Sequence, residues 1–158
     1  MSHYIQTPNR LPWPPIVYVA CFFGAAILQK IAPVPVTDGW LQTLPSLFGL
    51  LLCVAGLALD AFAVRELWRQ DTTILPTSGA TSLVTTGVFQ YTRNPIYIGN
   101  ALVLVGIAIA FRWTWLIVIL PAALGAIHAK AVLAEERHLA LRFSKQWHDY
   151  ARRTPRWL

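Results

Sequence analysis

The chain has 158 residues, of which 56% are hydrophobic and only 13% are charged, and its formal net charge is +6. With a mean hydropathy of +0.50, this composition places the chain in a membrane rather than among soluble domains. The basic balance favours anionic lipid headgroups as neighbours, and no interleaving of aromatic and basic residues argues for a nucleic acid partner.

Four apolar stretches approach or reach the length of a membrane span, because a hydrocarbon core about 30 Å thick needs roughly 17 to 25 helical residues. They cover about Ile16 to Ala32, Leu44 to Val64, Ile96 to Phe111 and Thr114 to Ala134. The third is the shortest and could be completed by snorkelling of Arg112, with Trp113 and Trp115 at headgroup level. The sequence therefore predicts one all-α, multi-pass membrane domain over residues 1–158 with about four transmembrane helices.

The connections between these spans differ in length. Pro33 to Trp40 is a short, turn-rich link, and Arg112-Trp113 leaves almost nothing between the last two spans, so these two should form a tight antiparallel hairpin. The loop at residues 70–93 is long and rich in Thr, Ser and Gly, which is typical of a lid, a binding loop or a plain linker. Residues 135–158 are expected to form a polar tail with a further helix.

The orientation follows from the basic residues. Of the 13 Lys and Arg residues, all except Lys30 and Arg112 fall on one side of the predicted spans. The positive-inside rule then places both termini and the 70–93 loop in the cytoplasm. Cys21 and Cys53 lie inside apolar spans, where packing is their expected role, and the sequence shows no Cys and His spacing that indicates a metal site.

A first motif begins the third span. Asn94 is a preferred N-cap residue and Pro95 a preferred first helical residue, so a helix N-terminus with free N–H groups is expected beside Arg93. Such an end suits a carboxylate or a phosphate. An equally open interpretation is that Asn94-Pro95 only caps a membrane helix. Tyr91 and Tyr97 could line a ligand or lie in an aromatic belt, and Gly99 could allow the close approach of a ligand or of another helix.

A second motif, Glu135-Glu136, follows the last apolar stretch. Two carboxylates near an expected helix C-terminus oppose the helix dipole, so a cation should compensate them. Lys130, Arg137 or the basic tail could do this, and so could the ammonium group of a ligand. Helical spacing places one polar stripe along this region, formed by His128, Glu135, His138 and Arg142.

Taken together, several segments resemble the isoprenylcysteine carboxyl methyltransferase and phospholipid methyltransferase family of integral membrane enzymes. They are Gly87 to Gly99, the apolar hairpin, Glu135-Glu136-Arg137-His138-Leu139, Phe143 to Tyr150 and Arg153-Thr154-Pro155-Arg156-Trp157. The resemblance covers about the C-terminal 75 residues. It implies S-adenosylmethionine as the methyl donor, S-adenosylhomocysteine as the product, and a lipophilic acceptor that enters from the bilayer.

The resemblance also implies roles for individual residues. The catalytic candidates are Arg93, Glu135 and His138. The cofactor-binding candidates are Tyr91, Arg93, Asn94, Pro95, Tyr97, Gly99, Glu135 and Glu136. Within this set the two glutamates would hold the ammonium and ribose side of the donor, and Arg93 with the start of the third span would hold its carboxylate.

The acceptor expected from the resemblance is most like that of isoprenylcysteine carboxyl O-methyltransferase. Asn94 stands where histidine is common in the family, and this departure suits the phospholipid-amine N-methyltransferase branch as well. Two further alternatives are a membrane reductase of the sterol-reductase type that uses NADPH, and a non-enzymatic membrane subunit.

Overall fold

The computed structural model describes residues 11–34, 43–72 and 79–158 and is helical, without strands, in these ranges. The helices are α2 (Trp13–Ile31), α3 (Thr43–Arg69), α4 (Pro95–Ala110), α5 (Thr114–Ile127) and α6 (Leu133–Arg153). Two short turns complete the order, the 3-10 turn η1 (Gly87–Gln90) and the π-helical turn η2 (His128–Val132). The predicted all-α class is confirmed. Most of the predicted Pro33 to Trp40 link, Arg10, and residues 73–78 of the 70–93 loop lie outside the described residues.

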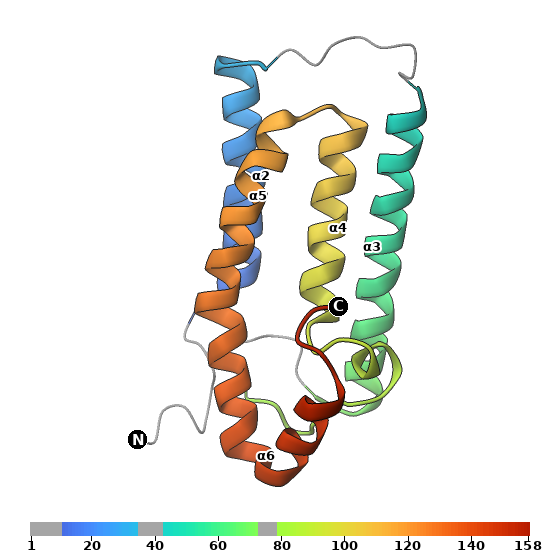
Figure 1. Ribbon diagram of the computed structural model, residues 1–158, viewed down its shortest axis with the longest axis vertical. Coiled ribbons are helices and arrows are strands. Elements are labelled where there is room, and N and C mark those ends of the chain that lie inside the picture. Colours follow the sequence, from blue (N-terminus) through green and yellow to red (C-terminus); the bar gives the residue numbers. More distant parts are fainter. Residues whose placement is uncertain (1–10, 35–42, 73–78) are drawn as a thin grey trace.

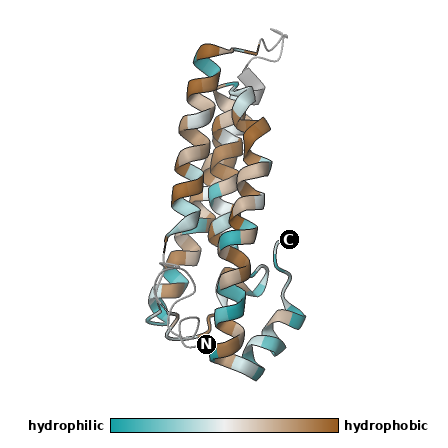
Figure 2. Cartoon of the chain, turned by 90° about the vertical axis from the view of Figure 1, so that its left-hand side faces the viewer, coloured by the Kyte–Doolittle hydropathy of each residue, from teal (hydrophilic) through white to brown (hydrophobic). Residues whose placement is uncertain are grey.

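Four apolar helices run side by side along the long axis of the molecule (Figure 1). Among the described helices, α2, α3 and the continuous stretch Thr114–Arg153 are long and apolar enough to cross a membrane. Helix α4 is shorter, with 16 residues, as its sequence indicated. Hydrophobic residues dominate one end of the bundle and hydrophilic residues gather at the other, around α6 and the C-terminal residues (Figure 2). We call this second end the polar end.

Helices α3 and α4 approach each other most closely through glycines. An added Cβ at Gly49 would lie 2.5 Å from the Gly106 oxygen, and one at Gly56 would lie 2.5 Å from the Gly99 oxygen. Small residues at these positions let the two backbones touch, which is how membrane helices gain packing contacts. At the apolar end the Ser46 hydroxyl donates a hydrogen bond to the Ala110 oxygen at 3.4 Å.

The predicted tight hairpin joins α4 to α5. Arg112 has a left-handed φ of 56°, and the Trp113 N–H donates to the Ala108 oxygen at 2.8 Å. This is the hydrogen bond of a Schellman helix end, a place usually taken by glycine. Helix α2 packs on α5, where the Trp115 Nε1 donates to the Ala32 oxygen at 2.7 Å. The buried core between them is formed by Tyr18, Cys21, Ala25, Leu116, Leu120, Ala123 and Ile127.

The helix end expected at Glu135-Glu136 is not present. The helical stretch that begins with α5 continues through η2 into α6, from Thr114 to Arg153. The chain then bends at Ser144, which has φ 43° and ψ −110°, and the last turns of α6 fold back toward the bundle (Figure 1). The bend returns the C-terminal residues to the start of α4, where the Arg93 N–H donates to the Pro155 oxygen at 3.0 Å.

Candidate functional site

The start of α4 carries the geometry that its sequence indicated, with one difference. Pro95 is the first helical residue and Asn94 occupies the N-cap position, but no side chain caps the helix. The Asn94 amide instead donates to the Arg156 oxygen at 2.8 Å. The first-turn N–H groups of α4 therefore keep the partial positive charge of a helix N-terminus without a side-chain cap to neutralise it.

Glu135 and Glu136 lie in the first turn of α6, in the middle of a continuous helix. The expected conflict with a helix C-terminal dipole therefore does not arise, because the helix continues for many residues beyond them. The intervening π turn contains one residue more per turn than an α-helix, so it rotates the following side chains relative to those of α5. Neighbouring residues on a helix point about 100° apart, and the two carboxylates accordingly have different partners.

Glu136 is held by two arginines. Its Oε1 atom lies 2.9 Å from the Arg93 Nη1, and it accepts from the Arg156 Nε at 2.9 Å. Its Oε2 atom accepts from the Arg156 Nη2 at 2.7 Å. Hydrogen bonding to this carboxylate raises the pKa of the Arg156 guanidinium. The cations that compensate Glu136 are thus Arg93 and Arg156. The basic tail, to which Arg156 belongs, was one of the expected alternatives, and Arg93 was not.

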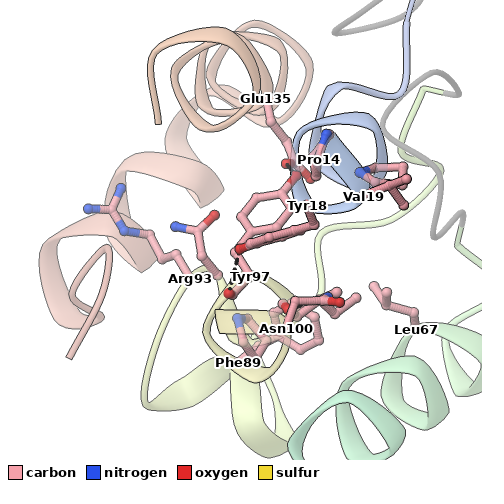
Figure 3. A pocket seen from close by; sticks show the side chains of 13 residues that line it. Pro14, Tyr18, Val19, Leu67, Phe89, Arg93, Tyr97, Asn100 and Glu135 are labelled. Carbon is pink, nitrogen blue, oxygen red and sulfur yellow. Dashed lines mark hydrogen bonds between the residues drawn. The ribbon is translucent and has the colours of Figure 1, made fainter. Parts of the chain in front are cut away.

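Glu135 points toward the interior of the polar end. Its Oε2 atom accepts a hydrogen bond of 2.9 Å from the Tyr97 hydroxyl, which joins α6 to the first turn of α4. The Tyr18 hydroxyl of α2 donates to the Tyr97 backbone oxygen at 2.8 Å. The side chains of Glu135, Tyr97 and Tyr18 therefore bring three helices together (Figure 3).

These residues line a cavity of about 380 Å³. Its polar wall contains Glu135, Arg93 and the first turn of α4, and its apolar wall comes from α2, the end of α3 and η1. Figure 3 shows how the labelled lining residues lie, with the end of the Arg93 side chain directed away from the others. The lining residues are Pro14, Pro15, Tyr18, Val19, Leu67, Phe89, Arg93, Asn94, Pro95, Ile96, Tyr97, Asn100 and Glu135.

Five of the predicted site residues meet at this cavity: Arg93, Asn94, Pro95, Tyr97 and Glu135. The other four predicted site residues, Tyr91, Gly99, Glu136 and His138, do not line it. The Tyr91 side chain is exposed, at 68%. Gly99 faces α3 instead, where an added Cβ would lie 2.0 Å from the Asp60 Oδ1.

The predicted stripe along the last helix is divided in the structure. The His128 ring lies 6.0 Å from the Trp157 ring, and His138 is buried, with only 1% of its surface exposed. Arg142 is exposed, and Glu135 faces the cavity. The π turn at His128–Val132 changes the phase of His128 relative to the other three residues, which all follow it in α6. Neither histidine lines the cavity.

The apolar wall of the cavity was missed in the sequence. Tyr18, Leu67 and Phe89 come from three different elements that lie far from Glu135 along the chain. A tyrosine inside an apolar span is the one signal that was available, since its hydroxyl requires a partner when it is buried. Within the described residues, no group of three or more His, Cys, Asp and Glu side chains could hold a metal ion.

Comparison with known proteins agrees with this architecture. The family model described as phospholipid methyltransferase matches residues 44–146, which include α3, the hairpin and both glutamates. The nickel-cobalt-cadmium resistance protein NccN of Alcaligenes xylosoxydans xylosoxydans is 36% identical over 107 residues, which cover 66% of this chain. The match spans about half of that relative, 48% of its length. No solved structure matches the chain. The family match covers well over half of the sequence, and the chain belongs to the phospholipid methyltransferase family of integral membrane enzymes.

Proposed function

We propose that the protein transfers a methyl group from S-adenosylmethionine to an acceptor with a lipophilic tail, in the cavity at the polar end. Membership of a family of membrane methyltransferases supports the reaction class. The observation that carries the proposal is the cavity itself, whose lining combines the Glu135 carboxylate, Arg93 and an uncapped helix N-terminus with an apolar wall. These are the groups that a zwitterionic donor and a lipid-like acceptor would each need.

The residues present fit the donor. Glu135 has one oxygen on Tyr97 and lines the cavity, so it would hold the donor ammonium. The Arg93 Nε is buried and has no hydrogen-bond partner among the described residues. Together with the first-turn N–H groups of α4, it would hold the donor carboxylate. When bound, the donor supplies an electrophilic methyl group, and the protein's contribution is to orient the acceptor in line with it.

The acceptor would enter from the bilayer along the apolar wall. Val19 of α2 and Leu67 of α3 belong to this wall, and both helices face lipid over much of their length. A carboxylate like that of a prenylated cysteine is the first candidate, because the segments around Arg93 and Glu135 resemble those of the isoprenylcysteine carboxyl methyltransferases. An amine headgroup is the second candidate, and it would need a base other than Glu135, which holds the donor ammonium, to accept its proton.

Binding of S-adenosylhomocysteine to the purified full chain in detergent tests the donor site. We expect micromolar binding by the wild-type chain and at least about a tenfold loss in Glu135→Gln, since a charged hydrogen bond contributes about 1.5–3 kcal/mol. Asp149→Asn is the matched control, because Asp149 pairs with Arg152 away from the cavity and should change nothing. Unchanged binding in Glu135→Gln would contradict the assignment. A thermal shift with NADPH and none with S-adenosylhomocysteine would favour a reductase instead.

The acceptor class is tested with labelled donor and a membrane lipid extract. A methyl ester releases its label as methanol in alkali, whereas an N-methyl group retains it. We therefore expect alkali-labile label for a carboxylate acceptor and stable label in the lipid fraction for an amine. No labelled lipid-soluble product at all would contradict the proposed reaction.

A further inference from the structure

The C-terminal residues fold over the start of α4 and make repeated contacts with it. We call residues 150–157 the tail clasp. The Tyr150 hydroxyl donates to the Phe89 oxygen at 2.6 Å. The Thr92 hydroxyl donates to the Arg156 oxygen at 3.2 Å, next to the bond from Asn94 to the same oxygen. The tail clasp is thus hydrogen-bonded to the segment that contributes Phe89, Arg93 and Asn94 to the cavity wall.

Glu136 is the charged anchor of this clasp. Both of its oxygens are engaged by Arg93 and Arg156, and its side chain is only 15% exposed. Bidentate arginine pairs of this kind are among the stronger and more directional hydrogen-bonded contacts in proteins. A carboxylate so engaged is poorly placed to hold a ligand ammonium as well.

The Arg93 side chain is fixed from both sides. Its Nη1 pairs with Glu136, and its guanidinium carbon lies 5.6 Å from the centre of the Trp147 ring. This arrangement leaves its Nε as the buried atom without a partner among the described residues. Glu136 therefore helps to fix the position of the Arg93 guanidinium.

From these contacts we infer that Glu136 is a positioning residue rather than a ligand of the donor: it anchors the tail clasp and holds Arg93 in the orientation that the donor carboxylate requires. This inference rests on the proposed function and sharpens it, because it separates the roles of two adjacent glutamates. Glu135 contacts the donor, and Glu136 acts through Arg93 and the tail.

Two measurements on the full chain in detergent test this inference. The first is hydrogen exchange at the Arg93 amide, which donates to Pro155, with the Ile98 amide inside α4 as internal control. The second is S-adenosylhomocysteine affinity. In Glu136→Gln we expect faster exchange at Arg93, unchanged exchange at Ile98 and about tenfold weaker binding. Arg156→Gln, at the more exposed end of the pair, should give both effects and serves if Glu136→Gln fails to fold.

A charge exchange adds a readout that a direct ligand would not give. The double variant Glu136→Arg with Arg156→Glu exchanges the carboxylate with one guanidinium, so positions 93, 136 and 156 still carry one anion and two cations. It should therefore restore slow exchange at the Arg93 amide and part of the S-adenosylhomocysteine affinity that each single change removes. Arg152→Gln is the control, because Arg152 pairs with Asp149 on the surface and contacts neither Glu136 nor Arg93 in that ion pair.

The outcomes are distinct. Weaker binding in Glu136→Gln with unchanged exchange at Arg93 would make Glu136 a direct ligand and overturn the inference. Faster exchange with unchanged affinity would also overturn it, because the clasp would not shape the donor site. If the wild-type chain fails to bind S-adenosylhomocysteine, the donor assignment falls, and the exchange measurements still decide whether Glu136 anchors the clasp.

Discussion

Two adjacent glutamates in one helix have different surroundings. Glu135 meets Tyr97 inside the cavity wall, and Glu136 meets Arg93 and Arg156 beside it. The sequence indicated that both belong with the start of the third span, and the structure brings both there. It could not separate their partners, because this depends on the phase of the helix, which the π turn at His128–Val132 sets.

Tyr97 is expected to support the donor site through its hydroxyl. In Tyr97→Phe the Glu135 carboxylate loses a donor at 2.9 Å, and S-adenosylhomocysteine binding should weaken by about tenfold. Tyr91→Phe removes the same atom from an exposed side chain and should leave binding unchanged. An equal loss of S-adenosylhomocysteine affinity in the two variants would show that Tyr91 also contributes to the donor site, and it would contradict the cavity as the donor pocket. Isothermal titration in detergent decides between them.

At the scale of the elements, most span bounds were predictable, but the C-terminal ends of α3 and of the last helix were not. Apolar length placed α2, α4 and the start of α5 within a few residues of their observed bounds, because hydrocarbon thickness constrains them directly. Helix α3 runs to Arg69, beyond the predicted Val64. The helix end predicted at Glu135 is not present either. Both helices outlast their apolar pattern, because a helix can continue beyond the apolar residues while it still has an amphipathic face.

The contact between α3 and α4 depends on the absence of side chains. Gly99→Ala would place a Cβ 2.0 Å from the Asp60 Oδ1 and 2.8 Å from the Gly56 oxygen. Overpacking of this kind typically costs about 1–3 kcal/mol, so we expect a clearly lower melting temperature in detergent. Gly125→Ala in α5 is the control, since no atom lies within 4 Å of its added Cβ and alanine is the better helix former. A melting temperature for Gly99→Ala equal to that of Gly125→Ala would show that α3 and α4 are not in close contact.

At the scale of the whole molecule, the polar end brings together residues from α2, α3, η1, α4 and α6. The nearly loopless hairpin predicted that the ends of the last two spans are neighbours, and this is why five of the thirteen lining residues were found from the sequence. The contribution of α2 was not found, because helices buried in lipid give no pattern that tells which neighbour they pack against.

The orientation in the membrane remains a prediction from the basic residues. It places the polar end in the cytoplasm and the Arg112 hairpin on the opposite side. Cysteine labelling checks it in a background that replaces Cys21 and Cys53. We expect a membrane-impermeant maleimide to react in right-side-out vesicles with Arg112→Cys but not with Leu158→Cys, and the reverse in inverted vesicles. The opposite pattern would invert the topology and place the donor site outside the cell.

The length of the continuous helical stretch from the hairpin to the glutamates also indicates how far Glu135 lies from the hairpin across the membrane. Between Thr114 and Glu135 it rises roughly 30 Å at about 1.5 Å per residue, which is close to the thickness of a hydrocarbon core. With the hairpin at one face of the bilayer, Glu135 stands level with the headgroups of the other. A lipid acceptor could then present its headgroup to the site while its chains remain in the membrane, and only the donor would have to arrive from water.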